Sequence, residues 1–171
     1  MGAGVADRSG FDGFVTAASP RLLRTAYLLT RDSAAAQDLV QIALVQAWRS
    51  WGRIDGDPLP YVRRIMINAY TAAWRRRWRD EVPTADLRDV GYEPHGSVEE
   101  RDLVWSALGQ LPRRMRAVLV LRYFEDLTEA QTAEMLGVSV GTVKSQSSKG
   151  LARLRVDATL APASTIAPRE S

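Results

Sequence analysis

A run near the C-terminus predicts two helices joined by a tight turn. Thr128 is a natural N-cap for the first helix, which Gly137 would end by taking a left-handed conformation. Ser139 can cap the next helix, which extends to about Arg155, and Val138 would fill the small core between the two helices. Residues from Leu127 to Arg155 are therefore expected to form a helix-turn-helix.

The second helix of this unit presents hydroxyl, amide and lysine groups near its start. Val143, Leu151 and Leu154 form its expected buried side. In helix-turn-helix proteins the start of the second helix enters the major groove, where such groups reach base edges and phosphates. The predicted DNA-binding residues are Thr142, Lys144, Ser145, Gln146, Ser148 and Lys149. Two short helices joined by a glycine also occur in ordinary bundles, and that alternative remains open.

Helical periodicity extends over most of the chain, and no stretch alternates as a strand would, so the predicted fold class is all-α. We expect two small helical domains, an N-terminal bundle at 11–79 and the helix-turn-helix domain at 98–156. Between them, 80–97 is an acidic linker, either a solvated spacer or a segment that occupies a basic channel on a partner. The composition of 157–171 predicts a disordered tail.

A helix expected from about Pro60 to Arg79 has two different faces. One is a plausible core stripe made of Tyr61, Val62, Ile65, Met66, Ala69, Ala72 and Ala73. The opposite face interleaves cations with aromatic rings, and its residues are Arg63, Arg64, Ile67, Asn68, Tyr70, Trp74, Arg75 and Trp78, followed by Arg76, Arg77 and Arg79. Such a surface suits single-stranded DNA, because rings stack on exposed bases while arginines hold the backbone. Alternatively, the tryptophans pack against a neighbouring helix.

The helix expected from Ala36 to Trp51 carries two apolar faces. Its core stripe consists of Leu39, Val40, Ala43, Leu44, Ala47 and Trp51. Ile42 and Val45 point the other way, beside Asp38, Gln41 and Arg49. An apolar pair ringed by polar groups indicates a protein partner, unless another helix of the same domain covers it.

The composition argues against metal binding and against enzymatic chemistry. The chain has no cysteine and a single histidine, His95, in the linker. Asp55 and Asp57 lie close together, but their glycine-containing loop is more typical of a turn than of a metal site. We therefore expect no metal, no cofactor and no enzymatic activity. With no long apolar run, the protein is expected to be cytoplasmic and not inserted in a membrane.

Three stretches together resemble one family. They are Asp38-Leu39-Val40-Gln41, then Tyr61 to Asn68, and Leu111-Pro112 through Val140-Gly141-Thr142-Val143-Lys144-Ser145. Over about 11–155 the chain resembles a bacterial RNA polymerase sigma factor of the compact, extracytoplasmic-function type. The resemblance implies a non-catalytic factor that binds core RNA polymerase and promoter DNA, directs promoter recognition and DNA melting, and can have an anti-sigma partner.

The resemblance also implies roles for residues. The helix from Asp38 to Arg49 would bind the polymerase clamp, and Asn68, with the loop Arg53 to Leu59, would hold a base flipped from the melted strand. Tyr70, Trp74 and the arginines would support strand separation, while Lys144, Ser145, Ser148 and Lys149 would read the upstream duplex. The chain departs from the family pattern at three positions, which hold Ile42 in place of an acidic residue, Ala72 in place of an aspartate and Gln146 in place of an arginine.

A transcriptional activator or repressor could use the same helix-turn-helix on duplex DNA, usually as a dimer. The basic and aromatic face of the N-terminal half argues against that function. A nuclease or recombinase would need a metal-binding carboxylate cluster or an activated nucleophile, and neither arrangement is evident.

Overall fold

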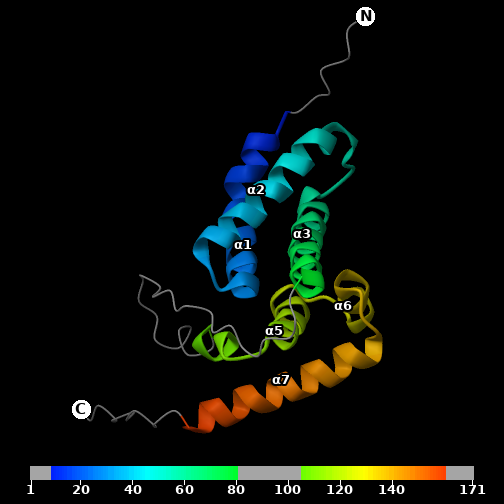
Figure 1. Cartoon of the computed structure of the whole chain (residues 1–171). Coiled ribbons are helices and arrows are strands. Elements are labelled where there is room, and N and C mark those ends of the chain that lie inside the picture. The colour runs from blue at the N-terminus through cyan, green and yellow to red at the C-terminus, as the bar shows by residue number, and fades with distance from the viewer. Residues whose placement is uncertain (1–8, 81–104, 161–171) are drawn as a thin grey trace, which may run out of the picture.

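The computed structural model describes residues 9–80 and 105–160, and it describes their side chains except for those of 74–80 and 157–160. This part of the chain is built from helices and contains no strand (Figure 1), so the all-α prediction is confirmed. Most of the predicted acidic linker, including His95, lies outside the described residues. None of the described helices is long and apolar enough to cross a membrane.

Three helices form an N-terminal module, with α1 at Phe11–Thr30, α2 at Ser33–Ser50 and α3 at Pro58–Asp80. A single turn, in which Arg31 adopts a φ of 58°, joins α1 to α2. The Asp32 carboxylate then accepts a hydrogen bond of 2.7 Å from the N–H of Ala35. This cap starts α2 at Ser33, three residues before the predicted start.

The start of α3 differs from the prediction for a similar reason. The helix begins at Pro58, two residues before Pro60. The Asp57 carboxylate accepts a 3.0 Å hydrogen bond from the N–H of Leu59, within the first turn, and Gly56 adopts a φ of 77° just before it. The Asp-Gly-Asp segment is therefore a helix-capping turn. The described residues contain no group of three side chains able to hold a metal ion.

Small residues let α1 and α2 pack closely in the core of this module. The buried residues are Ala18, Leu22, Ala26, Ala36, Leu39, Val40, Ala43, Leu44, Ala47, Val62 and Met66. The predicted stripe of α2 is thus confirmed, apart from Trp51. That ring lies in a short 3-10 turn, η1 (Trp51–Arg53), where it packs edge-on against Phe11 with centroids 4.9 Å apart.

The predicted core stripe of α3 is only partly correct. Val62 and Met66 are fully buried, but Tyr61, Ala72 and Ala73 are exposed. Ile67, which the projection placed on the solvent side, is fully buried instead. The reason is that the C-terminal half of the chain packs against the Ile67 side of α3, a contact that a helical projection of one segment cannot contain.

A C-terminal module follows, with helical residues at 105–109, then α5 (Arg113–Leu119) and its continuation η2 (Val120–Phe124), a wider π-type turn. The helix-turn-helix proper consists of α6 (Glu129–Leu136) and α7 (Val140–Leu160). α7 therefore continues past Arg155 and four residues into the range predicted to be disordered. Once a helix is established, extending it through good helix formers such as Ala158 and Leu160 costs little.

The predicted start and end of α6 and the predicted start of α7 are confirmed. Thr128 and Gln131 form a reciprocal capping box, in which each side chain accepts from the other residue's backbone N–H at 3.1 and 2.9 Å. Gly137 closes α6 with a φ of 65°, and the hydroxyl of Ser139 accepts from the N–H of Thr142 at 3.1 Å. These caps fix the angle between α6 and α7.

Close contact between α5 and α7 depends on Gly150. A Cβ atom at this position would lie 2.8 Å from Cδ1 of Leu119 and 2.9 Å from Cγ of Met115. Only glycine allows the two helix axes to approach this closely. The contact fixes α7 against the rest of its module.

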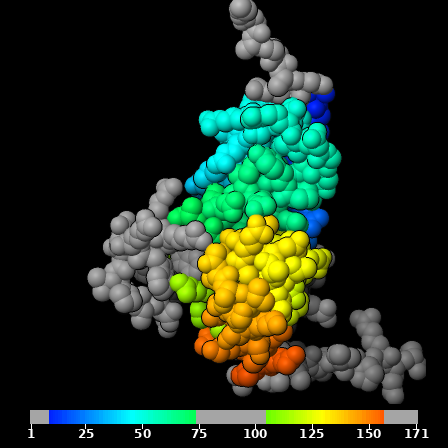
Figure 2. Space-filling model, turned by 90° about the vertical axis from the view of Figure 1, so that its right-hand side faces the viewer, coloured from blue at the N-terminus to red at the C-terminus, as the bar shows by residue number. Residues whose placement is uncertain are grey.

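The two modules share an apolar core. Leu28 and Leu29 of α1 and Ile67 of α3 belong to the same buried cluster as Leu121 and Leu136 of the C-terminal module. α6 contacts α3, while α5 and η2 contact α1. Figure 2 shows the C-terminal module, in yellow and orange, directly against the green surface of α3. The arrangement is therefore closed, with part of each module's surface covered by the other.

Candidate nucleic-acid interface

The predicted recognition residues lie together at the start of α7. Lys144, Ser145, Ser148 and Lys149 are exposed, whereas Thr142 and Gln146 are half-buried at the edge of the same surface. The opposite side of the helix, with Val143, Ser147 and Gly150, is buried against the module. The structure thus brings all six predicted residues onto one end of one helix.

A carboxylate touches this surface at one point. Nζ of Lys144 lies 3.8 Å from Oε2 of Glu129, which stands in the first turn of α6. Both side chains are solvent-accessible, so the ion pair contributes little to stability. Lys149 has no such ion pair among the described residues, and it remains the more accessible cation of the two for a DNA phosphate.

The contact between the two modules covers part of the predicted nucleic-acid face of α3 and leaves the rest exposed. Asn68 is exposed, but Tyr70 is half-buried and its hydroxyl donates a 3.3 Å hydrogen bond to the carbonyl oxygen of Leu29. Arg64 is exposed and pairs with Glu134 of α6, with Nη2 and Oε1 2.8 Å apart. The predicted residues Trp74, Arg75, Arg76 and Arg77 lie outside the described side chains.

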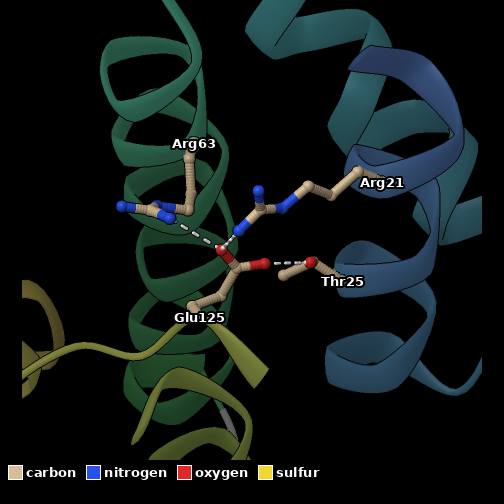
Figure 3. Close-up of polar contacts among 4 residues, drawn as sticks. All are labelled: Arg21, Thr25, Arg63 and Glu125. Carbon is tan, nitrogen blue, oxygen red and sulfur yellow. Dashed lines mark hydrogen bonds and ion pairs between the residues drawn. The ribbon is translucent and has the colours of Figure 1, made fainter. Parts of the chain in front are cut away.

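Arg63, another predicted nucleic-acid contact, points into the module interface. Its Nη1 donates a hydrogen bond of 2.8 Å to Oε2 of Glu125, and only 15% of the Arg63 side chain is exposed. Thr25 and Arg21 of α1 contact the same carboxylate (Figure 3). Sequence reasoning did not single out Glu125, Thr25 or Arg21. They come together only through contacts between segments far apart in the chain.

The predicted apolar pair of α2, Ile42 and Val45, lies on the outward face of the helix. Ile42 is 44% exposed, at the edge of a groove that α3 and α5 also line, and Val45 is 47% exposed. Asp38, Gln41 and Arg49 are exposed around this pair. A groove of about 370 Å³ beside Val45 extends toward α1, with Leu44 and Trp48 in its wall. An apolar pair left open in this way favours contact with another protein.

The fold and the surface of α7 define the class, an all-α DNA-binding protein with a helix-turn-helix. Residues 14–80 match the family described as Sigma-70 region 2, and residues 101–154 match Sigma-70, region 4. The chain is 40% identical to an RNA polymerase sigma-E factor of Streptomyces avermitilis, over 85% of this chain and 83% of the relative. It is 37% identical to the ECF RNA polymerase sigma factor SigM of Mycobacterium tuberculosis, over 86% and 76%.

The chain therefore belongs to the sigma-70 family of RNA polymerase sigma factors, in its extracytoplasmic-function group, whose members direct promoter recognition in transcription initiation. Two solved structures have a similar fold. One is the sigma factor RpoE of Bartonella quintana in complex with the anti-sigma factor NepR, with a TM-score of 0.63, 23% identity, and coverage of 88% of this chain and 98% of that one. The other is CnrH in complex with the cytosolic domain of CnrY, with a TM-score of 0.58, 22% identity and 91% coverage of both chains.

Proposed function

We propose that this sigma factor binds core RNA polymerase through the outward face of α2 and reads two promoter elements with its two modules. α7 reads the upstream duplex element, and the exposed part of α3 around Asn68 captures the strand that separates nearer the start site. The factor acts in the cytoplasm by binding alone, without covalent chemistry, and an anti-sigma protein is a further partner. The observation that carries the proposal is the open polar surface at the start of α7, backed by a buried apolar side.

Run-off transcription tests this function directly. Purified core polymerase, this chain and a library of promoter fragments are mixed, and the transcripts are sequenced. We expect transcripts only when the chain is present, from promoters that share two separated elements. A chain that does not bind core polymerase, or that binds duplex DNA tightly without it, would instead indicate a regulator of another class.

Lys149→Ala is expected to weaken duplex recognition by the polymerase complex. Lys149 is exposed on the surface of α7, where an ammonium group can neutralise one phosphate. Loss of one phosphate contact lowers the slope of log affinity against log salt by up to about 0.9 for duplex DNA. Binding of the polymerase complex to a double-stranded upstream element across a salt series measures this slope. Lys149→Arg keeps the charge and should behave as wild type.

Asn68→Ala is expected to act at a different step. Asn68 is exposed on α3, in the other module from α7, so its loss should leave duplex binding unchanged. Loss of the contacts to a captured base should lower the amount of open complex by about tenfold, equivalent to 1.4 kcal/mol. Permanganate reactivity of unpaired thymines measures strand separation. If Asn68→Ala and Lys149→Ala impaired the same step, either duplex binding or strand separation, the proposed division of roles between the modules would be wrong.

A further inference from the structure

A carboxylate is buried between the two modules. Glu125 follows η2 in the C-terminal module, and only 3% of its side chain is exposed. The hydroxyl of Thr25 donates a hydrogen bond to its Oε1, while Nη1 of Arg63 lies 2.8 Å from its Oε2. Nη2 of Arg21 lies 3.7 Å from the same Oε2. Figure 3 shows all three side chains, from α1 and α3, converging on this one group.

The three donors all belong to the N-terminal module, whereas the acceptor belongs to the other module. Arg21, Thr25 and Arg63 therefore form an anion site whose occupant is supplied from outside the module. The hydroxyl contacts one oxygen of that occupant and the guanidinium groups contact the other. A phosphodiester has two anionic oxygens that can be held in the same way, and arginine and threonine are common ligands of nucleic-acid phosphates.

The anion site shares helix α3 with the proposed strand-capture residue Asn68. Arg63 lies on α3, in the same helix as Asn68, and the next residue, Arg64, is held by Glu134 of the C-terminal module. Two adjacent arginines of α3 are thus both paired with carboxylates of the module that carries the helix-turn-helix. In this closed arrangement acidic side chains stand where a nucleic-acid backbone could lie.

We propose that Arg21, Thr25 and Arg63 form a binding site for a backbone phosphate of single-stranded promoter DNA, which Glu125 occupies in the closed arrangement. The phosphate replaces the carboxylate when the modules separate. The inference rests on the proposed function, because it takes α3 to be the surface that captures the melted strand. It adds α1 to the DNA-binding surface through Arg21 and Thr25.

Glu125→Gln tests the site, because it removes the charge and keeps the shape of the side chain. With a fluorescent single-stranded oligonucleotide as the probe, we expect the full-length variant to bind at least fivefold more tightly than wild type. The slope of log affinity against log salt should steepen by about 0.7 for the added phosphate contact. Asp126→Asn, which makes the same charge change at the exposed neighbouring residue, is the matched control and should bind as wild type.

Arg21→Ala added to Glu125→Gln should abolish most of this gain. A titration with inorganic phosphate, with chloride at equal ionic strength as the control, tells whether the site takes free phosphate or a phosphate of DNA. Displacement of the oligonucleotide by millimolar inorganic phosphate would mean that the site takes free phosphate, and it would overturn the assignment to DNA. A Glu125→Gln chain that is folded by circular dichroism but binds the oligonucleotide as wild type does would also overturn it.

A second variant covers the case in which Glu125→Gln does not fold. The Arg21 side chain is 54% exposed, so Arg21→Ala alone should leave the fold intact. In complex with core polymerase, Arg21→Ala should bind a pre-melted promoter bubble about threefold to tenfold more weakly, with a shallower salt dependence. Wild-type affinity and slope would contradict the phosphate site. Failure of the wild-type chain to bind polymerase would instead contradict the proposed function, so the two failures are distinguishable.

Discussion

Val45→Asp is expected to weaken binding to core RNA polymerase by about tenfold to a hundredfold, or roughly 1.4 to 2.8 kcal/mol. Val45 is 47% exposed on the outward face of α2, next to Ile42, and is thus free to be buried by a partner. An aspartate there would have to lose its hydration when a partner covers this apolar surface, and the desolvation of a charge is costly. Equilibrium titration of labelled chain with core polymerase measures the effect.

Val45 is a more informative position than Ile42. Ile42 stands where the family resemblance implies an acidic residue, so an acidic substitution there would restore the family pattern. Ala17→Asp is the control, since Ala17 is exposed on α1 and receives the same charge away from the proposed contact. It should bind polymerase as wild type does. Wild-type affinity of Val45→Asp would show that the outward face of α2 does not bind the polymerase.

Gly150→Val is expected to destabilise the C-terminal module by about 3 kcal/mol, the upper part of the usual range for overpacked cores. Even one added carbon would lie within 2.9 Å of Leu119 and Met115, and valine adds three. α7 must then move away from α5, which opens the apolar contacts between them. Urea denaturation, followed by circular dichroism, gives the change in the free energy of unfolding.

The matched control is the same substitution elsewhere in α7. A Cβ at Gly141 would have its nearest contact at 3.8 Å, with the Ser139 hydroxyl, so Gly141→Val should change stability by less than about 1 kcal/mol. Equal destabilisation by the two variants would mean that the cost comes from β-branching in the helix and not from the α5 contact.

Sequence alone could predict the parts of this fold that depend on local chemistry. The start and end of α6 and the start of α7 follow from a capping box, a left-handed glycine and a capping serine, all within a few residues of one another. The six residues on α7 share a surface because helical spacing determines which side chains lie together. The outward position of Ile42 and Val45 follows from the same periodicity.

The closed arrangement could not be predicted in this way. The helical projection of α3 treats Ile67 and Arg63 as solvent-facing, because nothing within that helix covers them. Their burial results from the C-terminal module, whose Glu125 is 62 residues away from Arg63 in the chain. Nothing near Glu125 in the sequence marks it as the partner of Arg63, since such a pairing depends on how the modules dock.

Because Glu125 and Arg63 belong to one chain, diluting the protein does not separate them. Any ligand of Arg63 therefore competes with a tethered carboxylate whose local concentration is fixed by the chain, and not by how much protein is present. The observed dissociation constant equals the intrinsic one divided by the fraction of molecules in which the contact is broken. Salt can shift that fraction in the free protein, but the abundance of the factor cannot.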